Sequence, residues 1–116
     1  TDFTARLLHG VISGSLVSPL ACQRMQGLLA RSLDPALRRA DPENQVDGFL
    51  GAELGANARL WSKAGWMGQA RHDAAYIELE GHQPFLVVAF SEGADRSADA
   101  SLLPALAQRL AAACRT

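Results

Sequence analysis

Residues 59–66 read Arg-Leu-Trp-Ser-Lys-Ala-Gly-Trp, and this stretch decides the fold that we expect for the chain. Lys63 is the only lysine in a chain with ten arginines, so a single ammonium group is held at one place. Gly65 lets another backbone or a ligand approach closely, because it carries no side chain. Side chains alternate between two faces with the period of a β-strand: Leu60, Ser62 and Ala64 on one face, and Trp61, Lys63 and Gly65 on the other.

Composition limits the chain to one domain and argues against two classes of function. A chain of 116 residues with 48% hydrophobic residues and a net charge of -1 can bury one core. The arginines are scattered among acidic residues, with Arg38 and Arg39 the only adjacent basic pair, so we expect no binding to nucleic acid. The longest apolar run, residues 85–90, is far shorter than the roughly 20 residues that cross a bilayer, so we expect no membrane span.

Two cysteines, Cys22 and Cys114, lie far apart in the sequence and have neither metal-ligand nor redox spacing. We expect buried thiols on helices, with a disulfide as the alternative. We expect neither a metal nor a cofactor. The chain begins at Thr1 without a methionine, so the sequence leaves the compartment open.

The first half of the chain predicts two helices and an irregular segment. Thr1 or Asp2 caps a helix that ends near Gly14 and carries its apolar residues on one side. Ser18 caps a second helix, which continues to about Ser32, and Pro19 occupies its first position. From Leu33 to Asn57 turn residues dominate, so we expect a loop with short helical pieces. Three apolar residues attach that loop to the core: Phe49, Leu50 and Leu54.

The second half predicts two further strands and a closing helix. Apolar residues alternate from about His72 to Leu79, which predicts a strand with one buried face. Residues 85–90 are apolar on both faces, so we expect a central strand that is covered on both sides. A polar loop spans residues 91–98, and a helix starts at Asp99 or Ser101 and lies across the sheet. The predicted fold is α+β, with two N-terminal helices, a three-stranded antiparallel meander and a C-terminal helix.

Several stretches of the chain resemble motifs of a known family. Residues 62–66 read Ser-Lys-Ala-Gly-Trp and are followed by residues 71–77, Arg-His-Asp-Ala-Ala-Tyr-Ile. Together they resemble the third active-site motif of the serine β-lactamases and penicillin-binding proteins, which is Lys-Thr-Gly or Lys-Ser-Gly. Residues 16–19, Leu-Val-Ser-Pro, and residues 44–51, Asn-Gln-Val-Asp-Gly-Phe-Leu-Gly, are similar to a subgroup of bacterial β-lactamase-like serine hydrolases. The match runs along the whole chain, onto only the C-terminal part of the family's domain.

This resemblance implies an arrangement of the sheet and a role for four residues of one strand. The sheet has five antiparallel strands with helices on both sides, and the Lys63 strand is an edge beside the cleft. Lys63 attracts a substrate carboxylate, and Ala64 replaces the hydroxyl residue that usually binds this carboxylate. Gly65 lets the substrate backbone lie alongside, and the Trp66 N–H is one donor to the oxyanion.

The resemblance also implies a cation on the next strand. Arg71 is the arginine that helps to hold the carboxylate. Because the connection is about one residue shorter than in common β-lactamases, His72 is the alternative at that place. An exposed cluster of caps and salt bridges is the other interpretation of Arg71, His72 and Asp73.

Two catalytic motifs of the resembling families are missing. Ser-x-x-Lys cannot occur, because Leu60 lies three residues before the only lysine, and no Ser-x-Asn or Tyr-x-Asn is present. A serine nucleophile needs a neighbouring base, so we expect a fragment, a split half or a degenerate descendant that does not acylate alone. The first hypothesis is the C-terminal part, residues 1–116, of a hydrolase that acts on a β-lactam, peptide or ester. In that case the edge of the strand at residues 85–90 is open, and we expect a missing N-terminal segment or a second copy there, because unpaired edges favour association. The second hypothesis is a non-catalytic module that uses this edge for homodimerisation or partner binding.

Overall fold

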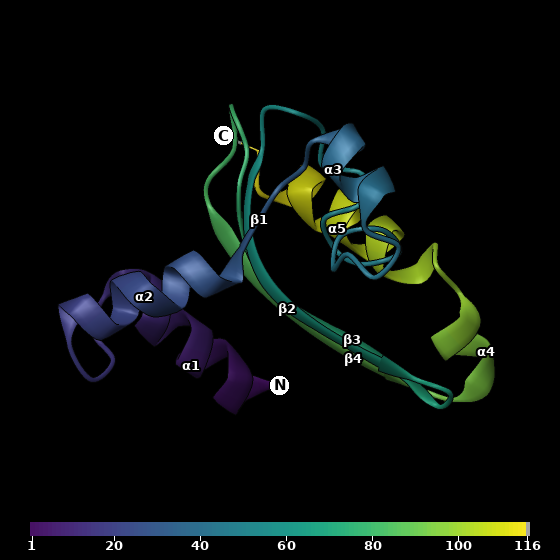
Figure 1. Ribbon diagram of the computed structural model, residues 1–116, viewed down its shortest axis with the longest axis horizontal. Helices are drawn as coiled ribbons and strands as arrows, with labels where there is room; N and C mark the ends of the chain where they lie inside the picture. The colour runs from purple at the N-terminus through teal and green to yellow at the C-terminus, as the bar shows by residue number, and fades with distance from the viewer. Residues whose placement is uncertain (116) are drawn as a thin grey trace.

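The computed structural model describes residues 1–115 and shows three layers (Figure 1). Helices α1 and α2 cover one face of a β-sheet, and α3, α4 and α5 lie on the opposite side (Figure 1). None of these helices is long and apolar enough to cross a bilayer. The elements in chain order are α1 (Asp2–Ser13), α2 (Pro19–Leu29), β1 (Ala30–Arg31), α3 (Pro35–Ala40), β2 (Arg59–Met67), β3 (Ala70–Glu78), β4 (Phe85–Glu92), α4 (Ala94–Ala98) and α5 (Leu102–Ala113).

The sheet is antiparallel with the strand order β1-β2-β3-β4, which confirms the predicted α+β class. In the register of β2 and β3, Lys63 lies opposite Ala74 and Gly65 lies opposite His72. The sheet has four strands where three were predicted. The extra strand, β1, pairs two residues after α2 with Leu60 and Trp61. Two residues are too few to show a periodic pattern, so the sequence gives no signal for β1.

The N-terminal helices begin and end for local reasons that the sequence shows. Gly14 has a φ of 77° and ends α1, a left-handed conformation that glycine adopts without strain. The Ser18 hydroxyl accepts a hydrogen bond from the Ala21 N–H at 3.1 Å and caps α2. Cys22 is buried beside α1, where its thiol donates to the Leu16 carbonyl at 2.9 Å. Both cysteines are free, so the disulfide alternative is wrong.

The core fills the space between the sheet and α5, with the loop before β2 inserted into it. Leu60, Ser62 and Ala64 are buried while Lys63 is exposed, which confirms the predicted alternation in β2. The residues that form the core cluster come from the loop, the three long strands and α5: Val46, Phe49, Leu50, Leu60, Ala64, Ala75, Ile77, Val87, Leu103 and Ala107.

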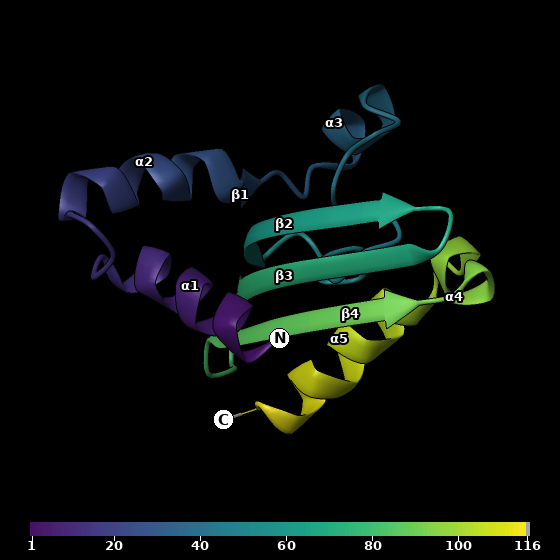
Figure 2. The ribbon, with the colours of Figure 1, turned by 90° about the horizontal axis from the view of Figure 1, so that it is seen from below.

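The prediction that residues 85–90 form a central strand is wrong within residues 1–115, where β3 lies between β2 and β4 and β4 is outermost. Side chains of α5 pack below one face of β4, and α1 lies across β3 and β4 on the other face (Figure 2). Apolar residues on both faces of a strand therefore reflect two covering layers, not two neighbouring strands. The outer edge of β4 pairs with no strand in residues 1–115, as the resemblance implied.

The polar segment after β4 is partly helical, so the predicted loop at residues 91–98 is wrong for Ala94–Ala98, which form α4. Ser97 is buried on this helix, and its hydroxyl bonds to the carbonyls of Met67 and Ala70. These bonds attach α4 to the turn between β2 and β3. A tertiary contact, and not local propensity, therefore holds this short helix.

Candidate functional site

The candidate site is the outer edge of β2, by which we mean the side of the strand turned away from β3. β1 covers this edge only at Leu60 and Trp61. Within a strand, the N–H and C=O of one residue point to the same side. Because Ser62 and Ala64 bond to side chains outside the sheet, the even-numbered residues present their main-chain groups here. Trp66 comes two residues later and presents its N–H and C=O on the same edge.

Side chains from two other segments meet this edge. Arg31 of β1 donates to the Ser62 carbonyl from Nε at 3.1 Å and from Nη2 at 2.7 Å. The Gln45 Oε1 atom accepts from the Ala64 N–H at 2.8 Å, from Arg31 Nη2 at 3.3 Å and from Lys63 Nζ at 3.4 Å. Lys63 also donates to the Ala64 carbonyl. The only ammonium side chain of the protein therefore lies along the outer edge of β2 and stays exposed.

A buried carboxyl lies behind this edge. Asp73 of β3 lies opposite Ala64 and is 1% exposed, and burial raises its pKa to about 6, although Arg31 and Lys63 attract its charge. Its Oδ2 atom accepts from the Leu50 N–H at 3.0 Å. Within residues 1–115, Asp73 Oδ1 and the Ser62 hydroxyl have no hydrogen-bond partner. The interpretation as an exposed cluster is wrong for Asp73, because the loop that carries Leu50 covers it.

Arg71 and His72 point to opposite faces of the sheet. Arg71 donates to the Ser97 carbonyl at 2.8 Å and to the Gly48 carbonyl at 3.2 Å, and its guanidinium lies 4.8 Å from the centre of the Phe49 ring. The His72 ring lies 4.9 Å from that of Phe90, and its Nδ1 atom accepts from the Ser91 N–H at 3.1 Å. Arg71 thus binds the loop before β2 and α4, whereas His72 packs on β4.

The six residues proposed from the sequence are therefore not one cluster. Lys63, Ala64 and Trp66 follow one another along the outer edge of β2. Gly65 lies between them, with open space where a Cβ atom would be. The Trp66 side chain is 48% exposed and packs against Phe49 with ring centres 5.4 Å apart. Arg71 is the direct neighbour of Trp66 on the adjacent strand, and His72 is that of Gly65.

Two functional candidates, Arg31 and Gln45, were not identified from the sequence. The second predicted helix continues to about Ser32 and so includes Arg31, whereas α2 ends at Leu29 and Arg31 lies in β1. Gln45 lies within residues 44–51, whose resemblance gave no role to single residues. The signal that could have found Gln45 is its place in that quoted stretch, which packs over the core at Val46.

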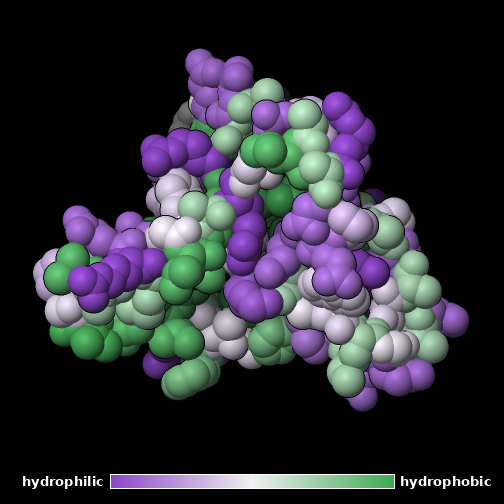
Figure 3. Space-filling model, viewed as in Figure 1, coloured by the Kyte–Doolittle hydropathy of each residue, from purple (hydrophilic) through white to green (hydrophobic). Residues whose placement is uncertain are grey.

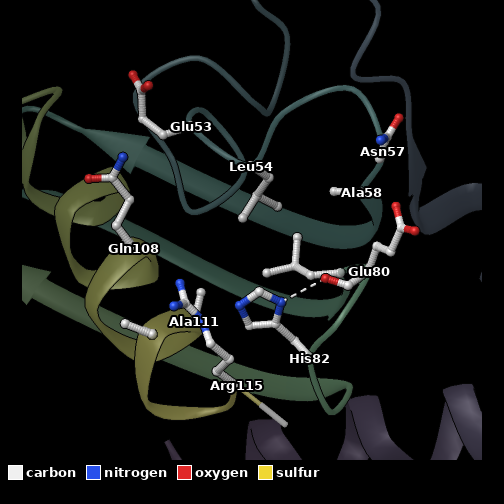
Figure 4. A pocket seen from close by; sticks show the side chains of 11 residues that line it. Glu53, Leu54, Asn57, Ala58, Glu80, His82, Gln108, Ala111 and Arg115 are labelled. Carbon is white, nitrogen blue, oxygen red and sulfur yellow. Dashed lines mark hydrogen bonds between the residues drawn. The ribbon is translucent and has the colours of Figure 1, made fainter.

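One hollow in the surface, of about 370 Å³, includes His72 in its lining, beside Met67 and Phe90. A hollow of about 200 Å³ adjoins the outer edge of β2 and includes Arg31 and Gln45 in its lining. A larger one, of about 470 Å³, lies beyond the start of β2, where His82 donates to the Glu80 carbonyl at 2.9 Å (Figure 4). It contains none of the six predicted residues. No three His, Cys, Asp or Glu side chains gather as a metal site in the part of the chain described.

Two solved structures share this fold. One is the β-lactamase from Sphaerobacter thermophilus DSM 20745, with a TM-score of 0.60 and 19% identity over 94% of this chain and 40% of that chain. The other is PBP-A, with a TM-score of 0.63 and 18% identity over 92% of this chain and 38% of that chain. A comparison with curated proteins gives no match. The fold is therefore that of the β-lactamase-like proteins, of which this chain spans about 40%.

Sequence comparison with protein families agrees with the fold. The model of the β-lactamase enzyme family matches residues 3–114, so the chain belongs to that family.

Proposed function

We propose that this chain is the C-terminal portion of a β-lactamase-like serine hydrolase and supplies the Lys-x-Gly strand at which a substrate docks for acyl transfer. The arrangement at the outer edge of β2 supports this most. There the Lys63 ammonium donates to Gln45 Oε1 and to the Ala64 carbonyl, and the main chain of Trp66 follows two residues after Ala64. The substrate is a small molecule or peptide that carries a carboxylate: a β-lactam, a peptide or an ester.

Each residue of this strand has a separate role in the proposal. Lys63 attracts the substrate carboxylate, because its charge is exposed and no acidic side chain pairs with it in residues 1–115. Gly65 leaves room for the substrate backbone, and the Trp66 N–H stabilises the oxyanion of the tetrahedral intermediate. Ala64 has no hydroxyl for the carboxylate. Arg71, or His72 in its place, adds a second contact to the carboxylate in the proposal, and Arg71 would then exchange its bonds to the Ser97 and Gly48 carbonyls for this contact.

The nucleophile comes from sequence outside this chain in the proposal. The chain has no Ser-x-x-Lys, and it covers only 40% and 38% of the two solved structures that share its fold. A serine activated by a neighbouring base is what acyl transfer of this kind requires. The isolated chain should therefore dock a substrate weakly and form no covalent adduct.

Labelling with a fluorescent penicillin and with an activated ester tests this proposal. The longer polypeptide encoded upstream of Thr1 is compared with residues 1–116 alone, and a Ser-x-x-Lys in the upstream sequence identifies the serine to replace by alanine. We expect covalent label on the longer polypeptide, loss of label in the serine variant, and no label on residues 1–116. Label on the isolated chain would show that the nucleophile lies within it and that the proposal is wrong.

A second candidate function is a non-catalytic interaction module, and the bare outer edge of β4 favours it. The half of the sheet near the turn from β2 to β3 is not covered by α1 or α2 (Figure 2), and Met67 and Phe90 are exposed there by 68% and 51%. Hydrophobic residues also gather on the surface of α1 and α2 (Figure 3). In this case a start codon at or near Thr1 is expected, with a homodimer or a bound partner at this edge, whereas a Ser-x-x-Lys encoded upstream of Thr1 favours the hydrolase.

A further inference from the structure

The outer edge of β2 is already filled over part of its length by side chains of the same protein. The Ser62 carbonyl accepts two hydrogen bonds from Arg31, the Ala64 N–H donates to Gln45, and the Ala64 carbonyl accepts from Lys63. A chain that docks on a strand edge bonds to the N–H and C=O groups of alternate residues. Two consecutive docking positions of β2, Ser62 and Ala64, are thus occupied before any substrate arrives.

We propose that Gln45, held by Arg31, is a stop that ends the docking edge of β2 at Ala64. A substrate backbone then pairs with β2 through Trp66 alone, and its carboxylate ends beside Lys63. The stop selects substrates in which one short group joins the scissile bond to the carboxylate beside Lys63. It excludes extended peptides, which would continue along β2 past Ala64. This inference rests on the proposed function, and it assigns to Gln45 a role in specificity and not in the chemical step.

The contacts around Gln45 show that its position is fixed from both sides. On one side, the Asn44 side-chain oxygen accepts from the N–H groups of Val46 at 3.0 Å and Asp47 at 2.8 Å, which shapes the backbone of the loop. On the other side, Val46 is 2% exposed in the core. A swing of Gln45 away from β2 therefore breaks side-chain bonds only, while its main chain stays in place.

The oxygen of Gln45 also accepts three donors at once, from Arg31, Lys63 and Ala64. Two of these donors are cations, and hydrogen bonds to charged groups are stronger than those between neutral groups. An extended peptide would have to replace all three bonds with its own carbonyl groups. A carboxylate beside Lys63 leaves both sets of bonds intact. The Ala64 N–H still donates to Gln45, and Arg31 still donates to the Ser62 carbonyl.

Amide hydrogen exchange, followed by NMR on residues 1–116, tests the stop without any substrate. In the wild-type chain the Ala64 amide should exchange at least about tenfold more slowly than in Gln45→Ala, while the Trp66 amide exchanges at the same rate in both. Gln45→Glu keeps the acceptor and should keep the protection. Gln69→Ala, in the turn between β2 and β3, is the matched control and should change neither amide. Equal exchange of Ala64 in the wild type and Gln45→Ala would overturn the stop.

A second measurement tests specificity in the longer polypeptide. Two activated esters that end in the same carboxylate are compared. One has a single residue between the ester bond and the carboxylate, and the other has three residues there, which would have to pair with β2 beyond Ala64. The ratio of their kcat/KM values should favour the short ester in the wild type and fall at least about tenfold in Gln45→Ala. An unchanged ratio with acylation intact overturns the stop but not the hydrolase. If neither ester acylates the polypeptide, the proposed function is wrong, and so is the role of Gln45 in specificity. The exchange rate of the Ala64 amide then decides whether Gln45 closes the edge.

Discussion

Asp73 Oδ2 accepts a hydrogen bond from the Leu50 N–H at 3.0 Å, and this bond joins the middle of the sheet to the loop that precedes β2. The same carboxyl is 1% exposed, and its other oxygen has no partner in residues 1–115. The Asp73 side chain thus fixes the loop that contains Gln45. Its burial also makes the charged form of the carboxyl unfavourable.

The stability of the chain should fall as the pH rises from about 4 to about 6. Burial raises the pKa of Asp73 from 3.8 to about 6, so in this range the folded chain binds more protons than the unfolded chain. A shift of about two units corresponds to about 3 kcal/mol in the free energy of unfolding, which is lost as the pH rises and stays lost above pH 6. Urea unfolding followed by tryptophan fluorescence at several pH values measures this loss.

Asp73→Asn is the control for this pH dependence. The amide oxygen can still accept from the Leu50 N–H, but the group does not titrate, so the free energy of unfolding should change little between pH 4 and pH 6. A slope in Asp73→Asn as steep as that of the wild type would show that another group causes the effect. Asp73→Ala also removes the acceptor and should cost about 1 to 3 kcal/mol relative to Asp73→Asn.

Gly51→Ala should destabilise the chain by about 1 to 3 kcal/mol, because a Cβ atom at this position would lie 2.3 Å from Leu60 Cδ2. Leu60 is 3% exposed in the core and cannot turn toward solvent. Gly27→Ala in α2 is the matched control, since nothing lies within 4 Å of its Cβ position. It should stabilise the chain by about 0.5 to 1 kcal/mol, because alanine favours the helix interior. Equal effects of the two substitutions in thermal unfolding would contradict the packing of the loop on β2.

Ser18→Ala should cost about 1 kcal/mol of stability, because it removes the acceptor for the Ala21 N–H at the start of α2. Ser18→Asp restores an acceptor and adds a negative charge at a helix N-terminus, so it should recover most of the loss. Denaturant unfolding of the two variants provides the measurement. A loss in Ser18→Asp equal to that in Ser18→Ala would show that the cap is not the cause.

The elements that the sequence predicted are those with a local signal. The alternation in residues 60–65 and the Ser18-Pro19 start of α2 depend on neighbours in the chain, and both are confirmed. β1 is too short for a period, and α4 is held by Ser97, whose partners lie about 30 residues away. The apolar faces of β4 predicted its two covering layers correctly, but they also led to the prediction of a central strand, which is wrong within residues 1–115.

The site was less predictable than the fold. Lys63 attracted notice because it is the only lysine, and its position on β2 follows from the strand pattern. Arg31 reaches this edge from β1 and Gln45 from the loop before β2, 31 and 19 residues away from the groups that they bind. Single polar residues in irregular segments carry no periodic signal. Their convergence on Ser62 and Ala64 depends on the folded chain and is visible only there.

The proposed role of Lys63 is to hold the carboxylate of a substrate at the outer edge of β2 by its charge. It is tested by the acylation rate of the longer polypeptide with a carboxylate-bearing β-lactam and with the methyl ester of the same compound. Lys63→Ala should lower kcat/KM for the acid at least about tenfold, leave the methyl ester nearly unchanged, and change stability by less than about 0.5 kcal/mol, while Arg59→Ala at the start of the same strand affects neither substrate. Unchanged acylation by the acid in Lys63→Ala would contradict the account.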